Sequence, residues 1–207
     1  MAIKAIFFDF DMTLVDTGQI GRKVYSAFSK YTKKPMTEKG FDGFMGTRIS
    51  ENIEEFSKNK KEEVELHKLF VKIHKEQLSS MKVYGSEILR YLKNKKIKII
   101  IISNTSRKII SLVCKHFNLK FDKLVADEDM KMGEEKHQII KKMMKKLKLG
   151  KGEVIYIGDH INDIKEGKKA GIRVISVTTG VYSKKELARY KPHRIINNLN
   201  ELKKIIA

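Results

Sequence analysis

Four short apolar runs, rich in β-branched residues, constrain the fold of this chain more than any other feature. They are AIFFDF (5–10), IKIIIIS (97–103), VIYIGD (154–159) and RVISVTTG (173–180). Their apolar residues are nearly continuous rather than alternating with polar ones, which is typical of strands buried on both faces of a parallel sheet. The sequence therefore predicts a sheet that is covered by helices on both sides.

Helical patterns separate these runs, so the expected fold class is α/β, with a doubly wound and mainly parallel sheet and right-handed crossovers. The helical patterns span 85–96, 106–119, 134–149 and 162–171. Weaker strand candidates lie at 123–127 and 193–197, and 198–207 is expected to close the chain as a helix.

The stretch between the first and second runs breaks this alternation. Helical patterns cover 21–31 and 64–78, and no buried strand is visible between them. The glycine-rich segment GFDGFMGTRIS (40–50) is expected to form a loop that approaches the active site. An insert directly after the first strand overlies the C-terminal end of the sheet, where open α/β sheets bind ligands.

These observations predict two domains. An all-helical cap is expected at 17–82, inserted into an α/β core that is formed by 1–16 and 83–207.

The charge of the chain invites a nucleic-acid interpretation, because its formal net charge is +19. Lysine outnumbers arginine 37 to 7, and the lysines are spread over nearly every predicted helix. Proteins that bind nucleic acids favour arginine, whose guanidinium bonds bases and phosphates through two N–H groups at once. We therefore expect a solvated surface and no nucleic-acid partner.

No apolar stretch approaches the ~20 residues that span a bilayer. A lone cysteine, Cys114, excludes an intramolecular disulfide, and we expect a cytoplasmic protein without membrane contact.

Carboxylates gather where the predicted strands end. Asp9 and Asp11 close the first run, and residues i and i+2 of a strand point to the same side. Asp159 closes the third run, with Asp163 four residues later. Carboxylates brought together are costly to desolvate unless a cation or a proton relieves their repulsion. Hard oxygen ligands suit Mg²⁺.

Groups suited to an oxyanion follow the second run. Ser103 and Asn104 end it, immediately before a helix begins. A phosphate needs a further positive group, and Lys136 is the best candidate because it opens the helix that leads to the third run. Lys131, in DMKMG, is the alternative.

Taken in order, these four strand-end patterns resemble the haloacid dehalogenase superfamily, in the branch of phosphoglycolate phosphatase and β-phosphoglucomutase-like proteins. The matching segments are DFDMT (9–13), Ser103 in IIISNTS, Lys136 and GDHIND (158–163). The resemblance covers nearly the whole chain and implies a Rossmann-like core with a helical cap. Two residues depart from the family's pattern: Met12 stands where glycine is commonest, and His137 follows the lysine where proline is usual.

The resemblance implies the chemistry of the nucleophile, the acid and the metal. Asp9 would attack phosphorus and form an aspartyl-phosphate, and Asp11 would serve as general acid and then as general base. Mg²⁺ would be held by Asp9, the backbone carbonyl of Asp11 and Asp159, while Asp163 would brace these ligands.

The resemblance also implies how the substrate is held. Ser103, Asn104 and Lys136 would hold the phosphoryl oxygens, and Arg48 of the cap would meet a second anionic group or sugar hydroxyls. The substrate would be a small phosphorylated metabolite, because a closing cap disfavours a phosphoprotein. Two activities stay open: a phosphatase resembling phosphoglycolate phosphatase, and a sugar phosphomutase of the β-phosphoglucomutase type.

Overall fold

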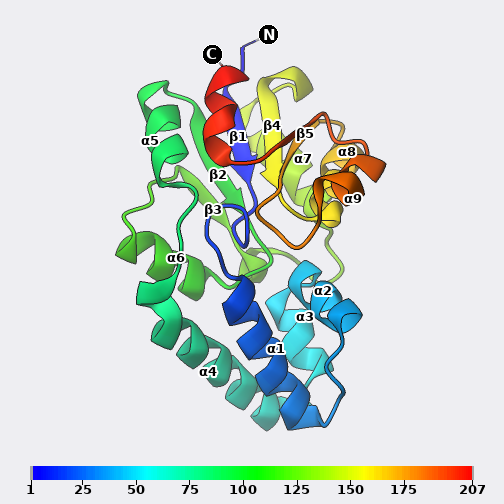
Figure 1. Ribbon diagram of the computed structural model, residues 1–207. Coiled ribbons are helices and arrows are strands. Elements are labelled where there is room, and N and C mark those ends of the chain that lie inside the picture. The colour runs from blue at the N-terminus through cyan, green and yellow to red at the C-terminus, as the bar shows by residue number, and fades with distance from the viewer. Residues whose placement is uncertain (1, 207) are drawn as a thin grey trace.

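A computed structural model describes residues 2–206, and its centre is one six-stranded, all-parallel sheet (Figure 1). The strands are β1 (Ala5–Phe8), β2 (Lys98–Ile102), β3 (Lys123–Val125), β4 (Val154–Gly158), β5 (Arg173–Val177) and β6 (Arg194–Ile196). Their order across the sheet is β3-β2-β1-β4-β5-β6, so the first strand lies in the middle. All six predicted strands are confirmed, including the two weaker ones.

Strand β1 is buried on both faces, as its continuous apolar run predicts. Phe8 pairs in register with Ile101 of β2 and Ile157 of β4. Phe8 packs into the hydrophobic cluster on one side of the sheet, whereas Phe7 packs into the cluster on the other side. This alternation follows from the two-residue period of a strand.

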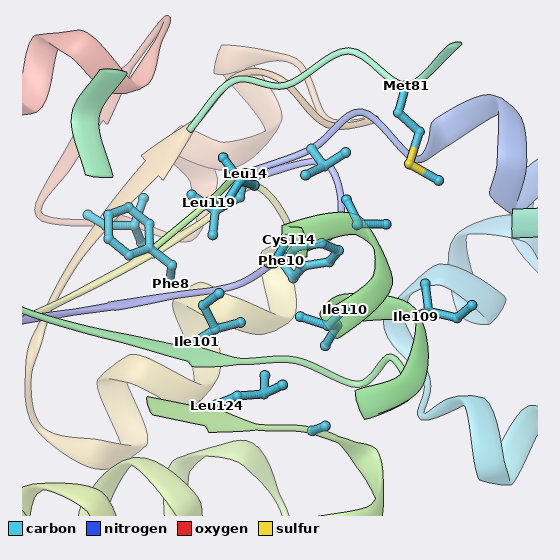
Figure 2. Close-up of a cluster of buried hydrophobic side chains, with 14 of the residues drawn as sticks. Phe8, Phe10, Leu14, Met81, Ile101, Ile109, Ile110, Cys114, Leu119 and Leu124 are labelled. Carbon is cyan, nitrogen blue, oxygen red and sulfur yellow. The ribbon is translucent and has the colours of Figure 1, made fainter. Parts of the chain in front are cut away.

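Helices cover both faces of the sheet (Figure 1). The core helices are α5 (Ser86–Asn94), α6 (Arg107–His116), α7 (Lys136–Leu147), α8 (Ile161–Ala170) and α9 (Lys184–Arg189), with 3₁₀ turns η2 (Asp127–Asp129), η3 (Lys151–Glu153) and η4 (Leu199–Lys204). Helices α5 and α6 share one apolar cluster with the sheet, and α7 and α8 share the other. Figure 2 shows the first cluster, in which Ile109, Ile110 and Cys114 of α6 lie beside Phe10 and Ile101.

The helical cap lies at the end of the sheet toward which β1 runs, and the chain termini lie at the opposite end (Figure 1). Its elements are α1 (Gly18–Thr32), α2 (Glu38–Gly46), α3 (Ile49–Glu55), α4 (Lys60–Gln77) and η1 (Leu78–Ser80). Aromatic rings fill its interior. Tyr25 and Phe28 of α1 stack at tilted or edge-on angles against Phe44 of α2 and Phe56. Within residues 2–206, no helix combines the length and the apolar character that a membrane crossing needs.

The expected loop at 40–50 is wrong, because the structure forms helix α2 over most of it. Thr37 caps this helix by accepting a hydrogen bond from the backbone N of Gly40 at 3.0 Å. Phe41 and Phe44, three residues apart, are both buried against the cap interior. Gly40 fits here because a Cβ would lie 2.2 Å from the hydroxyl of Tyr25. The glycine marks a close contact inside the cap rather than a flexible loop.

The chain end also differs from its predicted helix. Residues Leu199–Lys204 form a 3₁₀ helix, in which Leu199 and Leu202, three residues apart, are both buried. Three residues make one 3₁₀ turn, so this spacing suits that helix. Met1 and Ala207, at the ends of the predicted core segments, lie outside the described residues.

Candidate active site

The polar residues that follow β1, β2 and β4 meet at one edge of the sheet, as the sequence predicts. Pairing continues one residue beyond the strands: the backbone N of Asp9 donates to Ile157 O at 2.8 Å, and that of Ser103 donates to Val125 O at 3.0 Å. Because β1 lies between β2 and β4, Asp9 stands between Ser103 and Asp159. Parallel pairing thus brings together residues that are about 150 positions apart in the sequence.

Lys136 connects two of the predicted site carboxylates. Its Nζ lies 2.9 Å from Oδ1 of Asp9 and 3.0 Å from Oδ1 of Asp163. Burial lowers the pKa of Lys136, but the carboxylates of Asp163 and Asp9 outweigh this effect and raise the pKa well above its usual value. Lys136 is therefore a charged group inside the site. The backbone of the alternative lysine, Lys131, bonds to Glu134, and its side chain is exposed.

Asp159 is held by a residue that precedes the first helix of the cap. The hydroxyl of Thr13 donates to Oδ1 of Asp159 at 2.6 Å, and both residues are buried. Gly180, after β5, packs against the other carboxylate oxygen, because a Cβ there would lie 2.0 Å from Oδ2. Thr13 and Gly180 together fix the orientation of this carboxylate.

The carboxylates of Asp9, Asp159 and Asp163 form a cluster whose ligand oxygens all lie within 4.8 Å of one another. Burial raises the pKa of Asp9 to about 7, against the charge of Lys136. Burial and the charge of Asp9 also raise the pKa of Asp159 well above its usual value. A cation would relieve this cost of ionisation. The donor set is purely oxygen, which fits a hard ion such as Mg²⁺.

Asp163 is held through both of its carboxylate oxygens, whereas the bonds described above for Asp9 and Asp159 each use one oxygen. Oδ1 accepts hydrogen bonds from Lys136 and from the hydroxyl of Tyr156, at 3.0 and 3.1 Å, and Oδ2 accepts one from the backbone N of His160 at 3.1 Å. This arrangement favours a supporting carboxylate over a direct metal ligand.

Asp11 lies in the turn after β1, with its carboxylate held from the β2 side. Thr105 donates to Oδ2 of Asp11 at 2.6 Å, and Ser103 donates to the same atom at 3.3 Å. Met12 has a left-handed backbone, with φ at 55°. Glycine adopts this conformation without strain, which accounts for the family's preference at this position.

Asn104 contacts the cap rather than the carboxylates. Its side-chain amide donates to Gly46 O at 3.1 Å, and its backbone carbonyl accepts from the backbone N of Ile49 at 3.0 Å. The loop after β2 therefore joins the cap at the α2–α3 junction.

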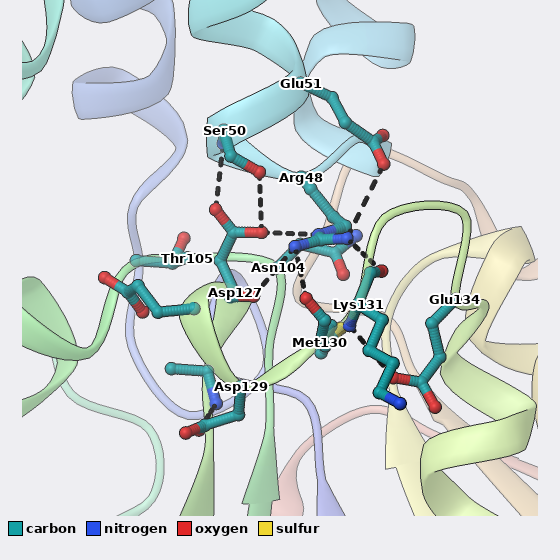
Figure 3. Close-up of polar contacts among 12 residues, drawn as sticks. Arg48, Ser50, Glu51, Asn104, Thr105, Asp127, Asp129, Met130, Lys131 and Glu134 are labelled. Atoms are coloured by element: carbon teal, nitrogen blue, oxygen red, sulfur yellow. Dashed lines mark hydrogen bonds and ion pairs between the residues drawn. The ribbon is translucent and has the colours of Figure 1, made fainter.

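Arg48 joins the cap to the core on the same side (Figure 3). Its Nε lies 2.5 Å from Oδ1 of Asp127, and its remaining nitrogens donate to the carbonyls of Asp127, Met130 and Lys131 at 2.9 to 3.1 Å. Asp127 also accepts from the backbone N and the hydroxyl of Ser50, both at 2.9 Å. Arg48 lies at the wall of the cavity, but this geometry favours a clamp between cap and core over contact with a substrate.

A cavity of about 430 Å³ lies between the cap and the strand ends. Asp9, Asp11, Asn104 and Lys136 line it from the core, and α1 to α4 line it from the cap. The cavity suits a small molecule, and the catalytic candidates face it.

The sequence did not point to three contacts of the site: Thr105 with Asp11, Asp127 with Arg48, and Thr13 with Asp159. Thr105 stands two residues after Ser103, in the segment already singled out for polar groups. The sequence around Asp127 does not indicate its contact with Arg48, because the two residues are 79 positions apart.

Comparisons with known proteins agree with this geometry. The sequence pattern of the family described as haloacid dehalogenase-like hydrolase matches residues 6–177. A curated protein from Caldanaerobacter subterraneus that bears the name putative pyrophosphatase PpaX is 28% identical over 211 residues, which cover 100% of this chain and 96% of that protein.

Two solved structures share the fold. A hydrolase from Pseudomonas syringae has a TM-score of 0.83 at 17% identity, covering 99% of this chain and 100% of that one. A predicted phosphoglycolate phosphatase from Haemophilus somnus has a TM-score of 0.81 at 18% identity, covering 99% and 98%. The family pattern spans most of the chain and all four strand-end motifs, and this protein therefore belongs to the haloacid dehalogenase-like hydrolases.

Proposed function

We propose that this protein is a Mg²⁺-dependent phosphatase that acts in the cytoplasm on small phosphorylated metabolites, in the manner of phosphoglycolate phosphatase, through an aspartyl-phosphate on Asp9. The observation that carries the proposal is the contact of Lys136 with Asp9 at a strand end that faces a covered cavity. A nucleophile and a fixed cation then face the same space, which phosphoryl transfer requires.

Asp9 serves as the nucleophile. One carboxylate oxygen attacks phosphorus, the bond from phosphorus to the leaving oxygen breaks, and the phosphoryl group becomes bonded to Asp9. The ammonium of Lys136, with Ser103 and Asn104, receives the phosphoryl oxygens and stabilises their charge in the transition state. Lys136 also keeps Asp9 oriented, because it bonds the carboxylate at 2.9 Å.

Asp11 moves the protons. In its protonated form it donates a proton to the leaving oxygen, and as a carboxylate it then takes a proton from the water that attacks the aspartyl-phosphate. Phosphate leaves and Asp9 is restored. The hydroxyls of Thr105 and Ser103 hold the Asp11 carboxylate in place for both steps.

Asp9, Asp159 and the backbone carbonyl of Asp11 would hold the metal, with Asp163 and Thr13 orienting its surroundings. When bound, Mg²⁺ supplies positive charge that offsets the repulsion between the carboxylates and the phosphate.

The segment 17–82 is proposed to act as a cap domain that closes over the substrate and excludes water. Its contacts with the core through Asn104 and Asp127 support a closed arrangement. A cavity of this size between cap and core favours a small metabolite over a protein or nucleic-acid substrate. The name of the curated relative adds pyrophosphate to the substrates to be tested.

The test is phosphate release from a panel of phosphomonoesters and pyrophosphate, with Mg²⁺ and with EDTA. Asp9→Asn is the control, because it removes the nucleophile and keeps the shape of the side chain. Release that needs Mg²⁺ and is lost in Asp9→Asn is the expected result. A folded protein that releases phosphate from no member contradicts the phosphatase; conversion of β-glucose 1-phosphate with a bisphosphate primer would then identify the mutase alternative.

A further inference from the structure

The turn that follows β1 carries the proposed general acid next to a residue with a strained backbone. Met12, which follows Asp11, has a left-handed backbone with φ at 55°. Residues other than glycine disfavour this region, because their Cβ comes too close to the following carbonyl oxygen. Such conformations persist only where the surrounding structure holds them, so the contacts of Met12 show what keeps this turn in place.

A hydroxyl from a distant loop holds the carbonyl group of Met12. Oγ1 of Thr179 donates to the carbonyl oxygen of Met12 at 2.5 Å, although the two residues are 167 positions apart. Thr179 lies two residues after β5, and its loop is itself anchored, because the backbone N of Thr178 donates to Ile196 O of β6 at 3.0 Å. The bond from Thr179 therefore ties the turn after β1 to the far side of the sheet.

The side chain of Met12 provides a second anchor. A Cβ at Gly18, the first residue of α1, would lie 3.2 Å from Sδ and 3.3 Å from Cε of Met12, so the thioether packs over that glycine. The family's usual glycine at position 12 has no side chain to make this contact. In this chain the turn gains packing against the cap but loses the backbone freedom of glycine, which makes the bond from Thr179 important.

The peptide group that Thr179 holds lies between two residues on which the proposed chemistry depends. Asp11 precedes Met12 and lines the cavity, whereas Thr13 follows Met12 and donates to Asp159 at 2.6 Å. Thr13 and Asp159 are both buried, but Asp11 is only half-buried. A loosened turn would therefore displace Asp11 first.

We propose that Thr179 is a positioning residue for proton transfer: by holding the turn at Met12, it keeps the carboxyl group of Asp11 within reach of the leaving oxygen. The inference rests on the proposed phosphatase function. As the bond from phosphorus to the leaving oxygen breaks, its electron pair goes to that oxygen, which takes the proton of Asp11. Thr179 acts through the turn, since it is not among the described residues that line the cavity.

Two phosphates of nearly equal size, ethyl phosphate and acetyl phosphate, distinguish this role from a merely structural one. Ethoxide needs a proton in order to leave, whereas acetate is stable as an anion and leaves without one. Their kcat/KM values report phosphoryl transfer to Asp9 and not the later attack of water, because release of ethanol or acetate makes the transfer effectively irreversible. We expect Thr179→Val to lower kcat/KM for ethyl phosphate by about tenfold or more, and that for acetyl phosphate by less than about threefold.

Thr179→Ser keeps the hydroxyl and should restore the wild-type ratio of the two kcat/KM values. Thr178→Val is the matched control, because Thr178 lies beside Thr179 in the same loop and outside the described lining of the cavity. Its ratio should equal that of the wild type. If circular dichroism shows that Thr179→Val does not fold, Thr179→Ala carries the test.

The Mg²⁺ concentration for half-maximal activity is a second measurement, and it should be the same in Thr179→Val and in the wild type. A rise in this concentration, equal losses with the two substrates, or a wild-type ratio in Thr179→Val overturns the inference and leaves the phosphatase standing. Wild-type protein that releases phosphate from neither substrate, nor from any member of the panel above, contradicts the phosphatase itself.

Discussion

Nζ of Lys136 lies 2.9 Å from Oδ1 of Asp9, the proposed nucleophile, and 3.0 Å from Oδ1 of Asp163. One ammonium group therefore links the end of β1 to the start of α8 through the first residue of α7. Without it, two buried carboxylates would face one another with no counter-charge.

Replacing Lys136 should remove this link and the fixed positive charge of the site. Lys136→Met is expected to lower kcat/KM by about 100-fold or more, because the phosphoryl oxygens lose a preorganised partner. Lys131→Met is the matched control. Lys131 is the alternative candidate for the phosphate-binding lysine, but its side chain is exposed, so this variant should change kcat/KM little. The measurement is phosphate release at saturating Mg²⁺, with circular dichroism to show that both variants fold. Full activity in Lys136→Met together with loss in Lys131→Met would reverse the assignment.

The pair of Arg48 and Asp127 should contribute to stability, because both side chains are largely buried: 11% and 4% of their surfaces are exposed. Within residues 2–206, Arg48→Ala leaves the Asp127 carboxylate with Ser50 as its one side-chain partner, and we expect a loss of about 3 kcal/mol in the free energy of unfolding. Arg22→Ala is the control, because its pair with Glu38 is exposed and screened by solvent, so that its loss should change the free energy of unfolding far less. Urea denaturation measures both values, and equal losses would contradict a buried clamp.

Gly180 should matter for the orientation of Asp159. A Cβ at position 180 would lie 2.0 Å from Oδ2 of Asp159, so the carboxylate or the turn must shift in Gly180→Ala. We expect the Mg²⁺ concentration for half-maximal activity to rise about tenfold, the scale at which disturbing the support of a ligand weakens metal binding.

Gly43→Ala is the control for Gly180→Ala. A Cβ at Gly43 would meet no atom of the described residues within 4 Å, and the residue lies inside α2. Alanine there should leave the Mg²⁺ dependence unchanged and raise stability by about 0.5–1 kcal/mol. An unchanged Mg²⁺ requirement in Gly180→Ala, measured by titration of the metal against phosphate release, would show that the turn yields without moving Asp159.

The strands and the strand-end residues could be predicted because their signals are local. A continuous apolar run identifies a buried parallel strand, and parallel pairing then places the following residues at one edge. Asp9, Ser103 and Asp159 meet in this way. The same reasoning assigned Lys136 from its place at the start of a helix.

The presence of a helical insert could be predicted, but helix α2 and the contacts between cap and core could not. The glycines of α2 are typical of a loop. Gly40 nevertheless lies in a helix, where the close approach of Tyr25 leaves no room for a Cβ. The Arg48–Asp127 pair depends on how two distant segments pack. His137 shows a similar effect: its backbone N–H donates to Glu166 at 2.9 Å, a bond that the family's usual proline cannot make.

Asp122 gives the fold a pH dependence that is independent of the active site. Burial opposes its ionisation, but hydrogen bonds from Lys93 and from the backbone N of Ile99, at 2.6 and 2.7 Å, outweigh burial and hold the pKa of Asp122 below its ordinary value of 3.8. Because the folded pKa lies below the unfolded one, this carboxylate stabilises the fold fully above about pH 4. The stabilisation is lost as the pH falls through the folded pKa.

Asp122→Asn should therefore lower the free energy of unfolding at pH 7 by about 0.5 kcal/mol, a value reduced by solvent screening because 39% of the side chain is exposed. The difference between wild type and variant should stay constant from pH 7 to about pH 5 and shrink below about pH 4, when the wild-type carboxylate takes up its proton. Urea denaturation of both proteins across this range measures it. A difference that grows as the pH falls would mean that the folded pKa is raised rather than lowered, and that the bonds from Lys93 and Ile99 do not favour the carboxylate.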